Sequence, residues 1–297
     1  MSGSVFAVLT ALAFAFTSIF ARRAVIKVPD ASVGVLITVP LGVLFCMVAL
    51  ILTGQIRSVA SLSWQSNAWL SAAGILHYVV GRSLNYNCVQ LVGANIANIL
   101  RNVSALVAAI LGVSLLGEPL SWELVIGVLL IVIGITLAGL NPQMFRDGQA
   151  LFSNMSLKAF LFGFGTGVSW GITPILIKVG LGGSVSPFAG AFVSFLAATV
   201  VLSVSLLNPK RGAALVGIPG KAIGLFCTDG LLSSTANLLR FVALSLAPAS
   251  VVHPLISISP VFLLVLSFLF NRKLEVFSMP VIIGTGTVVI GTILLIY

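Results

Sequence analysis

The sequence predicts an all-α integral membrane protein with ten transmembrane helices, arranged as two inverted repeats of five helices each. Three observations lead to this fold class: the scarcity of charged residues, a succession of apolar segments long enough to cross a bilayer, and a weak internal repeat. The repeat divides the chain into residues 1–148 and residues 149–297.

Charge is too scarce for a soluble protein. Only 7% of the 297 residues are Asp, Glu, Lys or Arg, against about 25% in an ordinary soluble domain, and 59% are apolar. The apolar content excludes a disordered chain, and the three cysteines are too few for a disulfide-stapled secreted domain. The net charge of +9 comes from Lys and Arg placed singly or in pairs, which favours membrane loops over nucleic-acid binding.

The apolar segments predict the spans, because a transmembrane helix needs about 20 mostly apolar residues. Short connections rich in Gly, Pro, Asn and charge separate them, as at Leu116–Pro119 and Asn208–Gly212. The predicted spans are 4–26, 31–53, 67–90, 94–116, 122–140, 158–180, 185–207, 220–244, 248–270 and 276–297.

The two halves of the chain share short matches in the same order. At an offset of 151 residues Ile26–Val28 matches Ile177–Val179, and at an offset of 157 Val132–Gly134 matches Val289–Gly291. Because five spans are an odd number, the second half then enters the membrane from the side opposite to the first. Inverted repeats of this kind are typical of transporters, which open a site at the repeat interface to either side.

Each half has a Glu near the end of its fourth span, followed by a fifth span punctuated by glycines. In the first half these are Leu116–Leu120 (Leu-Gly-Glu-Pro-Leu), Gly127 and Gly134; in the second they are Lys273–Glu275, Gly284 and Gly291. In this the chain resembles the EamA family of the drug/metabolite transporter superfamily. The resemblance implies a ten-helix transporter of metabolites. The stretch Asn271–Leu274 departs from the usual Gly-Glu pattern, so the local alignment of the repeats stays open.

The orientation in the membrane is also left open. Lys and Arg gather in the connections after odd-numbered spans, such as Arg22, Arg23 and Lys158, which would place that side in the cytoplasm and both termini outside. The family resemblance implies the opposite, with both termini in the cytoplasm.

The strongest functional signals are polar residues inside spans, where an ionisable group costs roughly 2.5–3.5 kcal/mol on insertion scales. They recur at helical spacing, so each set shares one face of its helix. The predicted substrate-binding residues are Tyr78, Arg82, Asn85 and Tyr86 in the third span, Asn98 and Arg101 in the fourth, Trp170 in the sixth, and Asp229, Ser233 and Asn237 in the eighth.

Two interpretations of these residues are possible. In the functional one, Arg82 and Arg101 bind an anionic group across a polar cavity, because the guanidinium fork can hold two oxygens at once, and Asp229 binds an ammonium group. In the structural one, Arg82 or Arg101 pairs with Asp229 and locks helices together. Arg240 is expected either in the same cavity or reaching to the membrane surface.

Gly163, Gly167 and Gly171 form consecutive GxxxG steps in the sixth span and predict close helix contact there. Because this span opens the second half, we expect it to move together with the first span during transport.

No nucleotide-binding motif or metal-ligand cluster is visible, so we expect no cofactor and no enzymatic activity. The sequence therefore predicts a secondary-active or facilitative transporter in the inner (plasma) membrane that moves an amino acid or organic anion, with export favoured, by alternating access. Its partners are a small solute and membrane lipid, with no nucleic acid, as a monomer or homodimer. A flippase of a lipid-linked head group and a phosphate-ester or anion exchanger are the alternatives. Substrate, direction and coupling are left open.

Overall fold

The computed structural model describes residues 3–139, 156–270 and 279–296, and every regular element in these ranges is helical. This confirms the all-α prediction. Six stretches are long and apolar enough to cross a bilayer by themselves: Gly3–Val25, Ala31–Leu52, Ile96–Leu116, Leu157–Leu181, Pro187–Ser205 and Gly220–Leu246. The predicted repeat boundary at 148/149 and the Lys273–Glu275 motif lie outside the described residues.

The first half contains α1 (Gly3–Val25), η1 (Ala31–Gly34), α2 (Val35–Leu52), α3 (Arg57–Ala60), α4 (Trp64–Gly74), η2 (Ile75–Gly81), α5 (Arg82–Arg101), α6 (Val103–Leu116) and α7 (Trp122–Gly139). The predicted third span is thus α4, a π-helical η2 and the first half of α5. The chain breaks at Gly93 inside α5, where φ is 78°. Such a φ suits glycine, which has no Cβ to clash, so the break separates the predicted third and fourth spans.

The second half contains α9 (Leu157–Leu181), α10 (Pro187–Ser205), α11 (Pro209–Val216), α12 (Gly220–Leu246), α13 (Ala249–Ser257), α14 (Ser259–Phe270) and α15 (Met279–Ile296). The predicted ninth span, 248–270, is therefore two helices. Pro260 lies at the start of α14, and its lack of a backbone N–H is compatible with a new helix beginning there.

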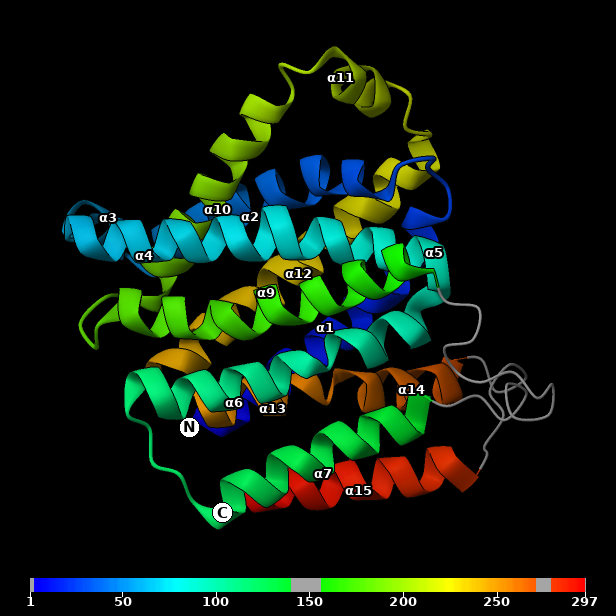
Figure 1. The fold of residues 1–297 in the computed structure, drawn as a ribbon. Coiled ribbons are helices and arrows are strands. Elements are labelled where there is room, and N and C mark those ends of the chain that lie inside the picture. Colours follow the sequence, from blue (N-terminus) through cyan, green and yellow to red (C-terminus); the bar gives the residue numbers. More distant parts are fainter. Residues whose placement is uncertain (1–2, 140–155, 271–278, 297) are drawn as a thin grey trace.

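The packing follows a two-fold pattern between the halves (Figure 1). The first helix of each half packs on the third span of the other: α1 lies on α12, and α9 lies on α4, η2 and α5. Equivalent helices also pair directly, as α2 with α10, α6 with α13 and α7 with α15. Exchanging the halves leaves this set of neighbours unchanged, as expected of two related repeats.

The two repeats run in opposite directions. Gly3, at the start of α1, lies against Ala247, which follows α12. Lys178, near the end of α9, donates from Nζ to the carbonyl oxygen of the same Ala247 at 2.6 Å. The beginning of α1 and the end of α9 therefore lie at the same end of the bundle, so the repeats are inverted.

The small residues of α9 make the close contacts that the GxxxG steps predict. A Cβ built on Gly163 would lie 2.5 Å from Cβ of Leu100, and one on Gly171 would lie 2.6 Å from Cβ of Val107. A Cβ built on Gly167 would likewise overlap the side chain of Val103. Helix α9 thus packs directly on α5 and α6.

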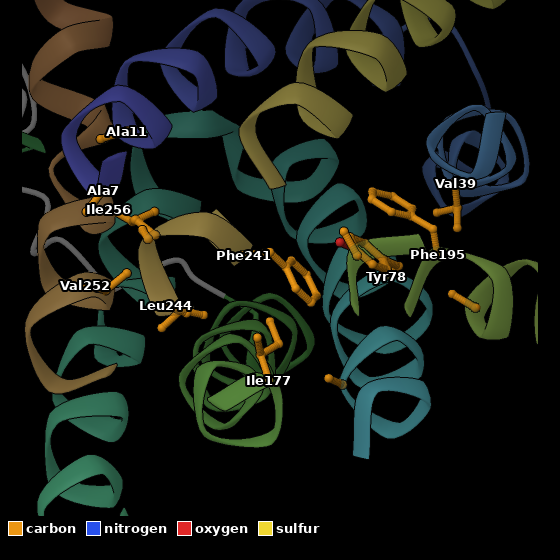
Figure 2. Packing of buried hydrophobic residues seen from close by; sticks show 14 of the residues in the cluster. Ala7, Ala11, Val39, Tyr78, Ile177, Phe195, Phe241, Leu244, Val252 and Ile256 are labelled. Carbon is orange, nitrogen blue, oxygen red and sulfur yellow. The ribbon is translucent and has the colours of Figure 1, made fainter. Parts of the chain in front are cut away.

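Aromatic packing fills the space between η2, α2 and α10 (Figure 2). The rings of Tyr78 and Phe195 stack with centroids 4.1 Å apart and an angle of 15° between their planes, and Val39 lies beside them. Both rings are completely buried. This packing fixes η2 against the second repeat, next to the polar residues described below.

Candidate functional site

A polar cavity lies between the two repeats. Its volume, counted as the space open to the centre of a water molecule, is about 110 Å³. One water needs about 10–15 Å³ by this measure, so the cavity has room for a small solute. Its polar and charged lining comes from both repeats: Thr17, Ser18, His77, Arg82, Asn85, Tyr86, Asn98, Arg101, Asn102, Ser104, Trp170, Asp229, Ser233, Arg240, His253, Ser257 and Ser259.

Arg82 begins α5 in the wall of this cavity. Its side chain is 5% exposed, and its Nη1 is buried with no hydrogen-bond partner. Its guanidinium carbon lies 5.5 Å from the centre of the Tyr78 ring, a contact that offsets part of the cost of burying the charge. The unpartnered N–H groups remain available to a ligand.

Arg240, on α12 of the second repeat, is 2% exposed. Its Nη1 lies 3.1 Å from the ring nitrogens of His77, while its Nε and Nη2 are buried without partners. A buried N–H donor without a partner costs stability, and more so when it is charged. Arg240 is therefore a second cationic group with unused donors in the cavity wall.

Arg101 belongs to a row of side chains that alternates between the repeats. Its guanidinium carbon lies 5.3 Å from the centre of the Trp170 ring. The Trp170 ring stacks on His77 at 5.2 Å, and its Nε1 donates to the His77 carbonyl oxygen at 3.2 Å. His77 in turn contacts Arg240. Arg101 and His77 belong to the first repeat, and Trp170 and Arg240 to the second.

Asp229 is the one carboxylate in the described cavity lining. It is 3% exposed, and Tyr86 donates its hydroxyl proton to Oδ2 at 2.5 Å. Among the described residues, Asp229 therefore accepts its side-chain hydrogen bond from Tyr86 and not from Arg82 or Arg101. Arg82 interacts with Asp229 electrostatically, but within the described residues no hydrogen bond joins Asp229 to Arg82 or Arg101.

Most predicted site residues lie in the cavity lining: Arg82, Asn85, Tyr86, Asn98, Arg101, Trp170, Asp229 and Ser233. Tyr78 and Asn237 lie outside it. Asn237 is fully buried and donates from Nδ2 to the Ser233 carbonyl oxygen at 2.7 Å. Tyr78 faces Phe195 instead.

The π-helix explains the position of Tyr78. The N–H of Arg82 bonds to the carbonyl of His77, five residues back, instead of four. The extra residue in this turn shifts the face of the helix by one position. His77, rather than Tyr78, therefore shares the cavity-facing side with Arg82.

Sequence reasoning left three ionisable lining residues out of the site: His77, Arg240 and His253. Arg240 was expected either in the cavity or reaching to the membrane surface, and its 2% exposure and place in the lining put it in the cavity wall. His253 was expected at the membrane interface, yet it is 5% exposed, and both of its ring nitrogens are buried without partners. The shared helical face with Asp229 and Ser233 was the available signal for Arg240.

The cavity is cationic in its described lining. Three arginines face one aspartate, and that aspartate already accepts a hydrogen bond from Tyr86. This arrangement is suited to binding anionic groups, because guanidinium N–H donors match carboxylate and phosphate oxygens.

Comparisons with known proteins agree with the fold. The sequence profile of the EamA-like transporter family matches residues 1–140 and 157–297. No curated protein matches the chain. A solved structure titled only "Crystal structure of protein" aligns with a TM-score of 0.76 at 17% identity, over 98% of this chain and 94% of that one. At that identity the likeness shows the fold alone.

The family profile covers nearly the whole chain in two copies. Proteins of this family carry small solutes across membranes as multi-pass helical proteins. The chain is therefore a membrane transporter that belongs to the EamA-like transporter family.

Proposed function

We propose that the protein transports a small organic anion by alternating access, using ten spans and the cavity between the repeats. One observation supports this most directly: Arg82 and Arg240 have buried N–H groups without partners in the cavity wall. Such groups cost stability in the unliganded protein, and their role is explained if a ligand satisfies them.

An anion is favoured over an amino acid. A zwitterion needs a free carboxylate for its ammonium group, and the carboxylate in the described lining, Asp229, is engaged by Tyr86 at 2.5 Å. Arg82 and Arg240 keep buried N–H groups without hydrogen-bond partners, and guanidinium groups suit carboxylate or phosphate oxygens. The amino-acid and lipid-linked substrates are outcomes that the experiment below distinguishes.

The packing of the two repeats supports alternating access. The cavity is lined by α1 and α5 of the first repeat and by α9 and α12 of the second. Each of α1 and α9 packs on the opposite repeat, so rocking one repeat against the other would open the cavity to either side.

The test is uptake into vesicles that are reconstituted with the purified protein and loaded with the same solute in unlabelled form. Radiolabelled succinate, glycerol phosphate and alanine represent the dicarboxylate, phosphate-ester and zwitterion classes. We expect saturable uptake of at least one of the two anions and a loss of at least tenfold for Arg82→Gln. Arg57→Gln, in the α3 segment outside the cavity lining, is the matched control and should transport normally. Uptake of alanine alone, or movement of a labelled lipid carrier without soluble solute, would contradict the proposal.

A further inference from the structure

We infer that the transporter is an obligate exchanger of dianions: it changes its facing side only with an anion bound, so each inward movement requires an outward one. The inference rests on the proposed function. It concerns the coupling of transport, and it follows from the charges that the two repeats bring together.

The described cavity lining has an uncompensated positive charge. Arg82, Arg101 and Arg240 contribute three positive charges and Asp229 contributes one negative charge, so two positive charges remain. The two histidines in the lining cannot supply negative charge in either protonation state. A ligand with two negative charges, such as a dicarboxylate or a phosphate monoester, neutralises the cavity.

Apart from Asp229, which interacts with Arg82 and is counted above, the neighbours of Arg82 and Arg240 compensate their charges only weakly. Arg82 has the face of Tyr78 at 5.5 Å, and Arg240 has the face of Phe241 at 5.9 Å. Arg240 also contacts His77, which offers it a neutral acceptor at most. Aromatic and neutral acceptors reduce the cost of burying a cation but do not remove its charge.

The cations lie on opposite repeats. Arg82 and Arg101 belong to the first and Arg240 to the second. Alternating access passes through a state in which the repeats close around the cavity and water is excluded. Without an anion, closure buries like charges together, which is unfavourable on both Coulomb and desolvation grounds. With a dianion between the repeats, the same closure brings opposite charges together.

A ligand shifts a conformational equilibrium only as far as it binds one state better than the other. Here the anion binds the closed state better, because closure surrounds it with arginines from both repeats. The unliganded protein therefore stays open to one side, and net flux in one direction is blocked after a single turnover. Exchange of one dianion for another is the remaining transport mode.

The experiment compares two vesicle populations that contain the whole protein. One is loaded with unlabelled succinate and the other with potassium chloride alone, both with valinomycin so that no membrane potential builds up. We expect the initial uptake of radiolabelled succinate to be at least tenfold faster into the succinate-loaded vesicles. The same comparison with glycerol phosphate and inorganic phosphate covers the other dianions.

A charge-removing variant provides an independent measurement. Arg240→Gln lowers the uncompensated charge, so the ratio of the two uptake rates should fall toward one, whereas Arg57→Gln should keep the wild-type ratio. Equal uptake into both populations by the wild-type protein would overturn the exchange inference and leave anion transport standing. If none of the three dianions enters under either loading, the proposed function itself is wrong.

Discussion

A very close contact between the repeats lies at Gly74 and can be tested with a single methyl group. A Cβ built on Gly74, in α4, would overlap the carbonyl oxygen of Ser194 on α10 and lie 2.5 Å from its carbonyl carbon and 2.7 Å from its Cα. All three atoms are backbone, so no side chain can rotate away. Ser194 also donates from Oγ to the Leu70 carbonyl at 2.7 Å, which holds the two helices together.

Gly74→Ala should therefore destabilise the protein by about 3 kcal/mol, the upper end of the usual cost of overpacking. The unfolding entropy is about 2.1 cal/mol/K per residue, which gives about 0.6 kcal/mol/K for this chain. A loss of about 3 kcal/mol in the free energy of unfolding therefore lowers Tm by about 5 °C. The assay is thermal unfolding in detergent, followed by intrinsic fluorescence.

Gly224→Ala is the matched control, because Gly224 lies in α12 with no atom within 4 Å of a built Cβ. Alanine favours a helix by up to about 1 kcal/mol over glycine, so this variant should unfold at the same temperature or slightly higher. Equal Tm values for the two variants would refute the close approach of α4 and α10.

Other contacts give further predictions. Tyr86→Phe removes the hydrogen bond to Asp229 and should cost about 1–3 kcal/mol, which thermal unfolding measures against the wild-type protein. Glu118→Gln should destabilise by about 0.5–2 kcal/mol, since its carboxylate accepts the first N–H groups of α13 at 2.6 and 2.8 Å. Glu123→Gln changes an exposed carboxylate in the first turn of α7 and should cost less than Glu118→Gln, and an equal or larger loss would refute the cap.

The site residues that were easiest to predict from the sequence are the charged ones, because burying a charged side chain in a membrane costs the most free energy. Arg82, Arg101 and Asp229 stand out because charges inside apolar spans need a polar environment, and the structure places all three in the cavity lining. The inverted repeat was likewise predictable, because an odd number of spans per half reverses direction.

The sequence could not predict which face of the third span each side chain occupies, or which side chains form hydrogen bonds with one another. Periodicity assumes 3.6 residues per turn, so the π-helix before Arg82 displaced Tyr78 from its predicted face. No spacing rule identifies Tyr86, rather than an arginine, as the partner of Asp229. The burial of Arg240 depends on its contacts with His77 and Phe241, and the contact with His77 joins the two repeats, which a span-by-span prediction does not give.

The π-helix also makes the cavity chemistry sensitive to the winding of one turn. At the same chain length, closing this turn as a regular α-helix would bond the N–H of Arg82 to the carbonyl of Tyr78, four residues back, and rotate everything before Arg82 by about 100°. Tyr78 would then replace His77 on the cavity side, and a phenol would stand where an imidazole now meets Arg240. Deleting one residue between His77 and Arg82 would instead restore the α-helical turn with His77 in place, so a relative that is one residue shorter here can keep the same cavity chemistry.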